Sequence, residues 1–235
     1  MAVAHVFVAD LEVPELDESD RRHLSHALRL RPGEEVTAAD GTGRWRSCRY
    51  ATGRPGGGRP SVALEPEGPV IYEEPLFPAV AVGFVVTKGS RPEWVVQKLT
   101  EVGVDRIVPL SSSRSVVRWD TDRAERNVER LRRVAREAAM QSRRSRLPEV
   151  TDVLPFAEAA VAGAALASAG GTAPSLERPC VLVGPEGGWD RTELDSGLPL
   201  VGLGPNVLRA ETAAVAVGVL LCALRSGLVA DGAQG

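Results

Sequence analysis

The chain of 235 residues has few cysteines and no long apolar run. Its three cysteines, Cys48, Cys180 and Cys222, are odd in number, widely separated and in none of the spacings of a metal site. We therefore expect reduced thiols in a cytoplasmic protein. The longest apolar run, 213–224, is too short to span a bilayer. The opening MAVAHVFVAD lacks the basic start and continuous apolar core of a signal peptide.

Lysine is nearly absent, so arginine carries most of the basic charge. The formal net charge of −3 gives no overall attraction to nucleic acid. The charge is unevenly distributed, because residues 114–146 include eleven basic and five acidic side chains. A solvated helix with ion pairs four residues apart would explain this stretch, and so would a phosphate-binding surface. The cluster Arg143, Arg144 and Arg146 has no acidic neighbour nearby, which favours phosphate binding.

The first seventy or so residues are typical of a small β domain. The turn signal Asp40-Gly41 separates two short strand-like runs, and a helix is expected from Ser19 to Leu30. Ser19 or Asp20 would cap that helix, and the Pro-Gly pair at 32–33 would end it. The expected strands are 3–8, 36–39, 45–50 and 61–65. A glycine- and proline-rich loop at 53–60 and a connector from 67 to 78 complete this part.

From residue 79 onward, strand-like and helix-like segments alternate. The expected strands are 79–86, 106–110, 180–184 and 200–203. Helices are expected at 92–102, 155–169, 190–196 and 210–225, and the one at 155–169 is rich in alanine. A further, arginine-rich helix has an apolar face at residues 131, 134, 135, 138 and 139. A loop is expected at 170–179. This alternation predicts an α/β domain with a mostly parallel sheet. We place the domain boundary between residues 72 and 73.

Two Gly-Pro loops follow predicted strands of this sheet, at 184–188 and 204–209. Ligands of such sheets bind at the carboxyl ends of the strands. Glycine lets backbone N–H and C=O groups approach a ligand closely, so two such loops after adjacent strands would form a pocket walled by backbone. Tight turns that need glycine for geometry are the alternative. Neither loop has the glycine spacing of a dinucleotide fingerprint or the Lys-Ser/Thr of a Walker loop.

Five ordered motifs resemble a known family. They are HLSHALRL at 23–30, KGSRPEWVVQKLTEVGVDRIVPL at 88–110, REAAMQSRRSRLPEV at 136–150, LVGPEGGW at 182–189 and LGPNVLRAETA at 203–213. Together they resemble the 16S ribosomal RNA uracil-N3 methyltransferases of the SPOUT superfamily. The resemblance implies a PUA-like β-barrel domain, then a SPOUT domain with a C-terminal trefoil knot that holds S-adenosylmethionine, in a homodimer. Asn206 departs from the family, which often has a larger or basic residue there, and this puts one RNA contact in doubt.

The implied reaction methylates N3 of a specific uridine in the small ribosomal subunit, expected at uracil 1498. The enzyme must align the two reactants and favour the deprotonated base. We expect Arg209 to stabilise the negative charge that develops on the base. A structural ion pair of Arg209 with Glu186 or Glu211 is the alternative. Those two carboxylates are also the available proton acceptors, although either would serve equally as a helix cap or a cofactor ligand.

Two further groups of contacts follow from the resemblance. Cofactor contacts are expected from the two Gly-Pro loops and the start of the last helix, at Val183, Gly184, Gly187, Gly188, Leu203, Gly204, Val207, Leu208 and Thr212. RNA contacts are expected from basic and polar residues, at His26, Arg29, Arg31, Lys88, Arg91, Arg136, Gln141, Arg143 and Arg144. A hydrogen bond with Glu137 competes with the RNA contact of Gln141.

Other functions were weighed against this one. A non-catalytic RNA-binding assembly factor and a SPOUT enzyme acting on another RNA site remain open. A nicotinamide-binding oxidoreductase is disfavoured, because the dinucleotide fingerprint is missing. His23 and His26 have no third ligand at metal spacing, so we expect no metal. Trp94 and Trp119 are candidates for base stacking, but the spacing of Trp94 favours a core position.

Overall fold

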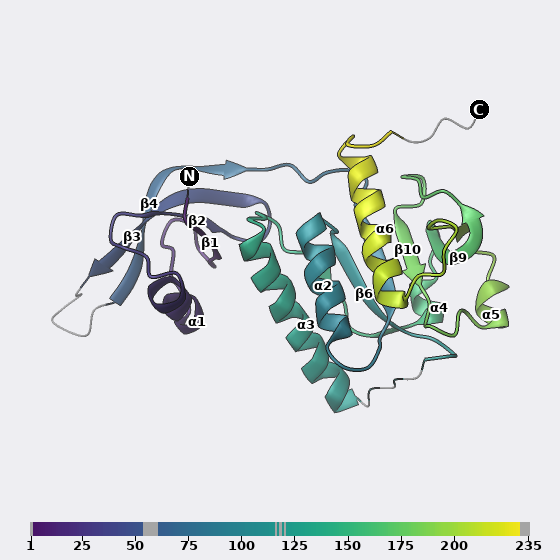
Figure 1. Ribbon diagram of the computed structural model, residues 1–235. Helices are drawn as coiled ribbons and strands as arrows, with labels where there is room; N and C mark the ends of the chain where they lie inside the picture. Colours follow the sequence, from purple (N-terminus) through teal and green to yellow (C-terminus); the bar gives the residue numbers. More distant parts are fainter. Residues whose placement is uncertain (1, 54–60, 116, 118, 120, 231–235) are drawn as a thin grey trace. The chain divides into compact units, whose positions relative to one another are not determined.

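The computed structural model describes residues 2–53, 61–115, 117, 119 and 121–230 (Figure 1). The chain splits into two compact units. The first unit comprises Met1–Pro75 with Ala139–Leu147, and the second comprises Leu76–Ala138 with Pro148–Gly235. No helix within the described ranges is both long and apolar enough to cross a membrane.

The first unit is built on a four-stranded sheet in the order β1-β2-β3-β4. The first pair is parallel and the other two are antiparallel. The strands are β1 Ala4–Phe7, β2 Glu35–Ala39, β3 Arg44–Gly53 and β4 Ser61–Tyr72. The predicted turn is confirmed, because Asp40 Oδ1 accepts the Thr42 N–H at 2.7 Å and Gly41 has a φ of 80°.

Strand β4 is longer than the sequence indicated. It pairs with β3 as far as Tyr72, so the connector expected from residue 67 is wrong in its first part. Pro66 and Pro69 interrupted the strand pattern in the sequence. Proline has no N–H to donate, yet it is tolerated at the edge of a sheet, and β4 is the last strand of this one.

The helix of the first unit begins earlier than expected and changes type. Helix α1 spans Glu18–Arg22 and continues as the π-helical turn η1, His23–Ala27. The cap is Asp17, whose Oδ1 accepts the Asp20 N–H at 2.7 Å, so the predicted cap at Ser19 or Asp20 is wrong. Most of the predicted loop at 53–60 lies outside the described residues.

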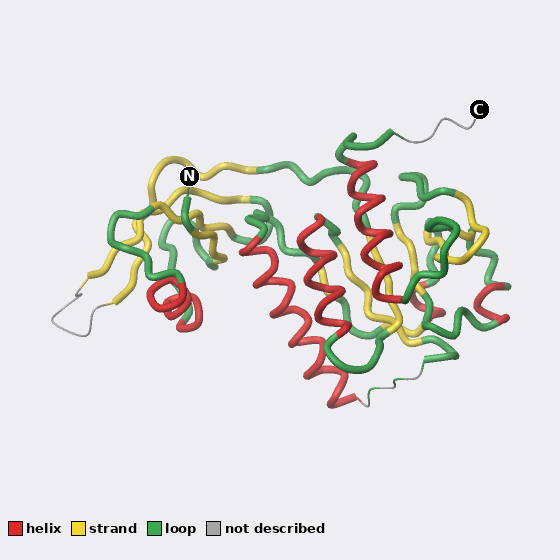
Figure 2. The backbone as a smooth tube through the Cα atoms, in the orientation of Figure 1, coloured by secondary structure: helices red, strands yellow, loops and turns green. Residues whose placement is uncertain are grey.

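The second unit contains an all-parallel sheet in the order β11-β9-β10-β5-β6-β7, with β8 paired to β6 (Figure 2). The strands are β5 Ala81–Val85, β6 Arg106–Ser111, β7 Glu149–Val150, β8 Leu154–Pro155, β9 Ala164–Thr172, β10 Cys180–Val183 and β11 Leu200–Val201. The predicted parallel sheet is confirmed. However, β9 separates β10 from β11, so the two Gly-Pro loops do not follow adjacent strands as expected.

Strand β9 replaces the alanine-rich helix that was predicted at 155–169. Only α4, Phe156–Ala159, is helical there, and residues 170–172 of the expected loop belong to the strand. Helix α4 ends at Ala159, and Gly163, with a φ of 86°, lies in the turn that leads into β9. At Gly171 an added Cβ would lie 2.5 Å from the backbone of Val201, so the two strands approach too closely for a side chain. This pairing overrides the helix propensity of alanine.

The remaining helices follow the sequence closely. They are α2 Arg91–Val102, α3 Thr121–Gln141, α5 Arg191–Leu194 and α6 Ala210–Arg225. Gly103, with a φ of 101°, ends α2 as predicted. The apolar face of α3 is confirmed by the burial of Leu131 and Ala135. Trp94 of α2 is 44% exposed, so its predicted core position is wrong.

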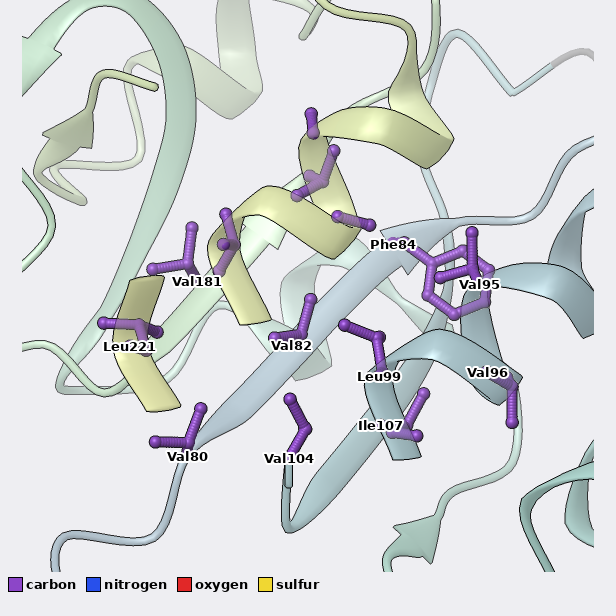
Figure 3. Close-up of a cluster of buried hydrophobic side chains, with 14 of the residues drawn as sticks. Val80, Val82, Phe84, Val95, Val96, Leu99, Val104, Ile107, Val181 and Leu221 are labelled. Atoms are coloured by element: carbon purple, nitrogen blue, oxygen red, sulfur yellow. The ribbon is translucent and has the colours of Figure 1, made fainter. Parts of the chain in front are cut away.

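Helices α2 and α6 pack on strands β5 and β10 through a continuous apolar core (Figure 3). Val82, Leu99 and Leu221 meet there, and all three are fully buried. Burial of such a side chain contributes roughly 1.5–3 kcal/mol. Gly218 lets α6 approach α2, because an added Cβ would lie 2.6 Å from Leu99. The core therefore fixes the start of α6, which carries several candidate site residues.

Candidate active site

The candidate site lies where the parallel strands of the second unit end. Parallel strands have their carboxyl ends at one edge of the sheet, and ligands bind at that edge. Helix α2 follows β5 there, the first Gly-Pro loop follows β10, and the second leads from β11 into α6 (Figure 1). The sheet therefore brings three sequence-distant segments to one edge.

The first Gly-Pro loop turns around a buried tryptophan. Trp189 is 5% exposed and its Nε1–H donates to the Ala167 carbonyl at 3.1 Å. An added Cβ on Gly184 would lie 3.0 Å from the Trp189 ring, so Gly184 is required for this packing. Gly187 and Gly188 have open space where a Cβ would be, and Gly188 has a φ of 71°. The Gly188 N–H donates to the Pro185 carbonyl at 2.8 Å, so the loop closes as a turn with open space beside both glycines.

A capping box holds the far end of this loop. Asp190 accepts the Thr192 N–H at 3.0 Å, and Glu193 accepts the Asp190 N–H at 2.8 Å. The backbone and hydroxyl hydrogen bonds from Thr192 hold the pKa of the Asp190 carboxyl below its usual value. Arg114 Nη1 donates to the Gly187 carbonyl at 3.1 Å, which ties the segment after β6 to the loop. Sequence reasoning counted Arg114 only as part of a basic stretch.

The second Gly-Pro loop exposes backbone and one apolar side chain. Gly204 has a φ of 113° and nothing within 4 Å of an added Cβ. Leu203 and Leu208 are half-buried and pack against the core, whereas Val207 is 97% exposed. Thr212 is exposed in the first turn of α6. The loop therefore has an anchored apolar base and an open, glycine-lined backbone.

Arg91 joins the start of α2 to both candidate carboxylates. Its Nη1 lies 3.0 Å from Glu186 Oε1, and its Nε lies 3.7 Å from Glu211 Oε1. Glu211 is only 15% exposed, and its Oε2 is buried with no hydrogen-bond partner. These contacts give Arg91 a role within the site that the sequence did not indicate, since it was expected to bind RNA.

Arg209 is free of the structural ion pair that the sequence left open. It is the N-cap residue of α6, its side chain is exposed, and it forms no ion pair with any described residue. Its two expected alternative partners, Glu186 and Glu211, pair with Arg91 instead. The guanidinium of Arg209 is thus available to a substrate beside the second loop.

The other expected RNA-contact residues are spread over both units. In the second unit, Lys88 is exposed after β5, and Arg136 is half-buried on α3. In the first unit the exposed side chains are His26, Arg29, Arg31 and Gln141. Glu137 and Gln141, both described residues of α3, form no side-chain hydrogen bond with each other. Across the described ranges, no three His, Cys, Asp or Glu side chains gather to hold a metal ion.

The arginine cluster at 143–146 makes structural contacts inside the first unit. Arg143 Nη2 donates to the Ala2 carbonyl at 2.6 Å, and Arg146 donates to the carbonyls of Thr42 and Glu73. The Arg144 carbonyl accepts a hydrogen bond from His5 Nε2 at 3.0 Å. These contacts hold the segment against the β strands, so the cluster has a structural role that phosphate binding does not explain.

Comparisons of the sequence identify relatives over most of its length. Residues 73–221 match the model of a family described as an RNA methyltransferase domain. Proteins named ribosomal RNA small subunit methyltransferase E match in Mycobacterium bovis, with 35% identity over 87% of this chain and 86% of the relative, and in Bacillus subtilis, with 27% identity over 81% and 82%.

Solved structures with the same fold include members under the same name. A ribosomal RNA small subunit methyltransferase E from Neisseria gonorrhoeae, bound to S-adenosyl methionine, has 27% identity and a TM-score of 0.76 over 94% of this chain and 97% of its own. A probable rRNA-methyltransferase from Porphyromonas gingivalis shares the fold, with a TM-score of 0.80 and 24% identity over 97% and 100%. The chain therefore belongs to the ribosomal RNA small subunit methyltransferase E family of RNA methyltransferases, which confirms the expected family.

Proposed function

We propose that this protein transfers a methyl group from S-adenosylmethionine to N3 of a specific uridine in the 16S RNA of the small ribosomal subunit. The observation that carries the proposal is the unpaired guanidinium of Arg209 beside the second Gly-Pro loop. Membership in the methyltransferase E family and the cofactor in the Neisseria gonorrhoeae relative support it.

The two Gly-Pro loops fit the cofactor. The open space beside Gly187, Gly188 and Gly204 would let an adenine edge and a ribose approach the backbone of the loops closely. The half-buried Leu203 and Leu208 and the buried Val183 offer apolar surface to the adenine ring. We assign the remaining cofactor contacts to Val207 and Thr212, which are exposed beside these groups, and to the backbone of Gly184.

S-adenosylmethionine supplies an electrophilic methyl group on a sulfonium, and the protein must prepare the uridine nitrogen to accept it. Uracil N3 is normally protonated, so negative charge develops on the base as the proton leaves. We assign to Arg209, which is exposed beside the second loop, the stabilisation of this charge at O2 or O4 of the base. Holding two reactants in line can lower the activation barrier by about 7–11 kcal/mol in the best oriented systems.

The proton leaves toward one of the two carboxylates that Arg91 holds. Glu211 is the better candidate, because it is nearly buried and its Oε2 has no hydrogen-bond partner. A buried oxygen without a partner gains free energy when it acquires a proton or a donor. Glu186 is more exposed and is held by Arg91 at 3.0 Å, so we assign it to positioning.

We further infer the domain architecture, the oligomeric state and the cellular location that family membership implies. The first unit would be a PUA-like barrel that binds RNA through the exposed His26, Arg29 and Arg31. The C-terminal part of the second unit would form a trefoil knot around the two loops, and the protein would work as a homodimer in the cytoplasm. Lys88 would meet the RNA beside the site.

A methyl-transfer assay tests the proposal. Small ribosomal subunits that lack N3-methyluridine are incubated with the protein and labelled S-adenosylmethionine, and the nucleosides are then identified by mass spectrometry. We expect N3-methyluridine at one position, with uracil 1498 as the expected site. Methylation of another atom or another RNA would replace the substrate assignment. A protein that binds the subunit without transferring methyl groups would be an assembly factor.

A further inference from the structure

A cavity lies beside the candidate site and uses none of its loop residues. It has a volume of about 630 Å³ and is lined by the turn after β5, the first turn of α2, Val117 and Trp119 before α3, and the first half of α3. Its wall includes Lys88, Trp119, Arg123, Asn127 and Arg130. Lys88 is only three residues before Arg91, so the cavity adjoins the site through the start of α2.

The polar wall of this cavity favours an anion. Arg123, Asn127 and Arg130 are spaced four and three residues apart, so they share one face of α3. Arg130 is held toward α2 by Glu93, whose Oε1 lies 3.1 Å from its Nε. Lys88 forms no hydrogen bond or ion pair with any described residue, and neither does the side-chain amide of Asn127. The lining therefore includes three cationic side chains, one of which is paired with Glu93.

Trp119 adds a flat apolar surface to these charges. Its ring is half-buried and packs against the core of the second unit while it also lines the cavity. A fixed indole next to cations is the combination that proteins use for unstacked RNA bases, because the base stacks on the ring and the phosphate meets the cations. The volume lies within the usual range of small-molecule sites, about 300–1,000 Å³, and exceeds what a bare phosphate needs.

We propose that this cavity binds one nucleotide of the RNA substrate next to the methylated uridine. Its base would stack on Trp119, its edge would meet the Asn127 amide, and its phosphate would contact Lys88 and Arg123. The nucleotide is a neighbour of the target and not the target, because the cavity wall contains no residue of the two Gly-Pro loops and does not include Arg209. The inference rests on the proposed function, since it requires an RNA substrate.

The test compares Arg123→Glu with Arg126→Glu. Both residues are exposed arginines on α3, but only Arg123 lines the cavity. Affinity for small ribosomal subunits lacking N3-methyluridine is measured by filter binding over a range of salt concentrations. We expect Arg123→Glu to weaken binding on the order of tenfold more than Arg126→Glu does. The slope of log affinity against log salt concentration should also become shallower, by the amount that about one phosphate contact contributes. Equal affinities for the two variants would overturn the proposal.

Two further variants separate stacking from charge and from folding. Trp119→Phe keeps an aromatic ring and should bind subunits nearly as the wild type does, whereas Trp119→Leu should lose roughly tenfold in affinity. Both variants keep an apolar group against the core, and thermal unfolding checks that they fold. Equal binding by the Leu and Phe variants would contradict base stacking.

The outcomes distinguish this proposal from the proposed function. S-adenosylmethionine affinity, measured by calorimetry, should be the same in all four variants, because the cavity has no loop residue. Wild-type protein that binds subunits but transfers no methyl group would end the methyltransferase proposal while leaving the binding comparison valid. Transfer by the wild type together with unchanged subunit binding in Arg123→Glu would end the nucleotide proposal alone.

Discussion

Arg91 Nη1 lies 3.0 Å from Glu186 Oε1, which links the start of α2 to the first Gly-Pro loop. The same guanidinium lies 3.7 Å from Glu211, so a single side chain joins three segments of the site. Arg91→Met would leave the nearly buried Glu211 carboxylate without its cation. We expect methyl transfer to fall by roughly tenfold to a hundredfold, in line with the loss of a charged hydrogen-bond partner.

A variant that keeps the charge separates this positioning role from a general loss of structure. Arg91→Lys keeps a charge and should recover part of the rate. Equal rates for Arg91→Lys and Arg91→Met, with circular dichroism showing that both variants fold, would contradict the role assigned to this pair.

Arg209 is expected to act directly on the base. Arg209→Ala should abolish most methyl transfer, because removal of one oriented donor from a developing negative charge typically costs about a hundredfold to a thousandfold in rate. The fold should be unaffected, since the side chain is exposed and unpaired. Single-turnover rates and circular dichroism measure the two effects. Near-normal turnover would remove Arg209 from the mechanism.

Arg225 holds the end of α6 to the turn between α2 and β6. Its side chain is 4% exposed, pairs with Asp105, and donates to the Gly103 carbonyl at 2.8 Å. Arg225→Met should lower the free energy of unfolding by about 3 kcal/mol, because it removes the cation paired with the Asp105 carboxylate and the donor to the Gly103 carbonyl. Urea denaturation measures this change. Arg191→Met is the matched control, since Arg191 is 92% exposed and 3.9 Å from Asp195, and it should not move the midpoint measurably.

His5 should make the first unit sensitive to acid. Burial lowers the pKa of its imidazole below the usual 6.5. The neutral ring fits its surroundings, because Nε2 can donate to the Arg144 carbonyl at 3.0 Å while Nδ1 accepts from the Thr37 hydroxyl at 2.7 Å. The unfolded chain therefore binds a proton more readily than the folded chain, so this contribution to stability is present above pH 6.5 and is lost as the pH falls below it.

Thermal unfolding between pH 7.5 and pH 5 measures this effect of His5. The wild-type midpoint should fall more steeply below about pH 6.5 than that of His5→Gln, which has no group that titrates in this range. His23→Gln serves as the control, because His23 is exposed and should leave the slope unchanged. A wild-type slope equal to that of His5→Gln would exclude the imidazole as the cause.

Most of the fold could be predicted from local sequence patterns. The exact span of α6, the glycine that ends α2 and the parallel sheet all follow from periodicity and end signals that act within a few residues. The alanine-rich segment 155–169 could not be predicted in this way. Its strand β9 is set by pairing with β10 and with β11, which comes close at Gly171, and these are contacts between residues far apart in the sequence.

The features of the candidate site likewise fall into two groups, those that local sequence predicts and those that depend on the tertiary structure. The sequence by itself determined the two glycine-rich loops, the position of Arg209 before α6 and the family, because each is a property of contiguous residues. Only the tertiary structure decided that Arg91 pairs with Glu186 and Glu211, and that Trp119 lines a cavity with Arg123. Ion pairs and cavities depend on which side chains the folded backbone brings within a few ångströms of one another. The spacing of residues along the sequence does not predict that distance.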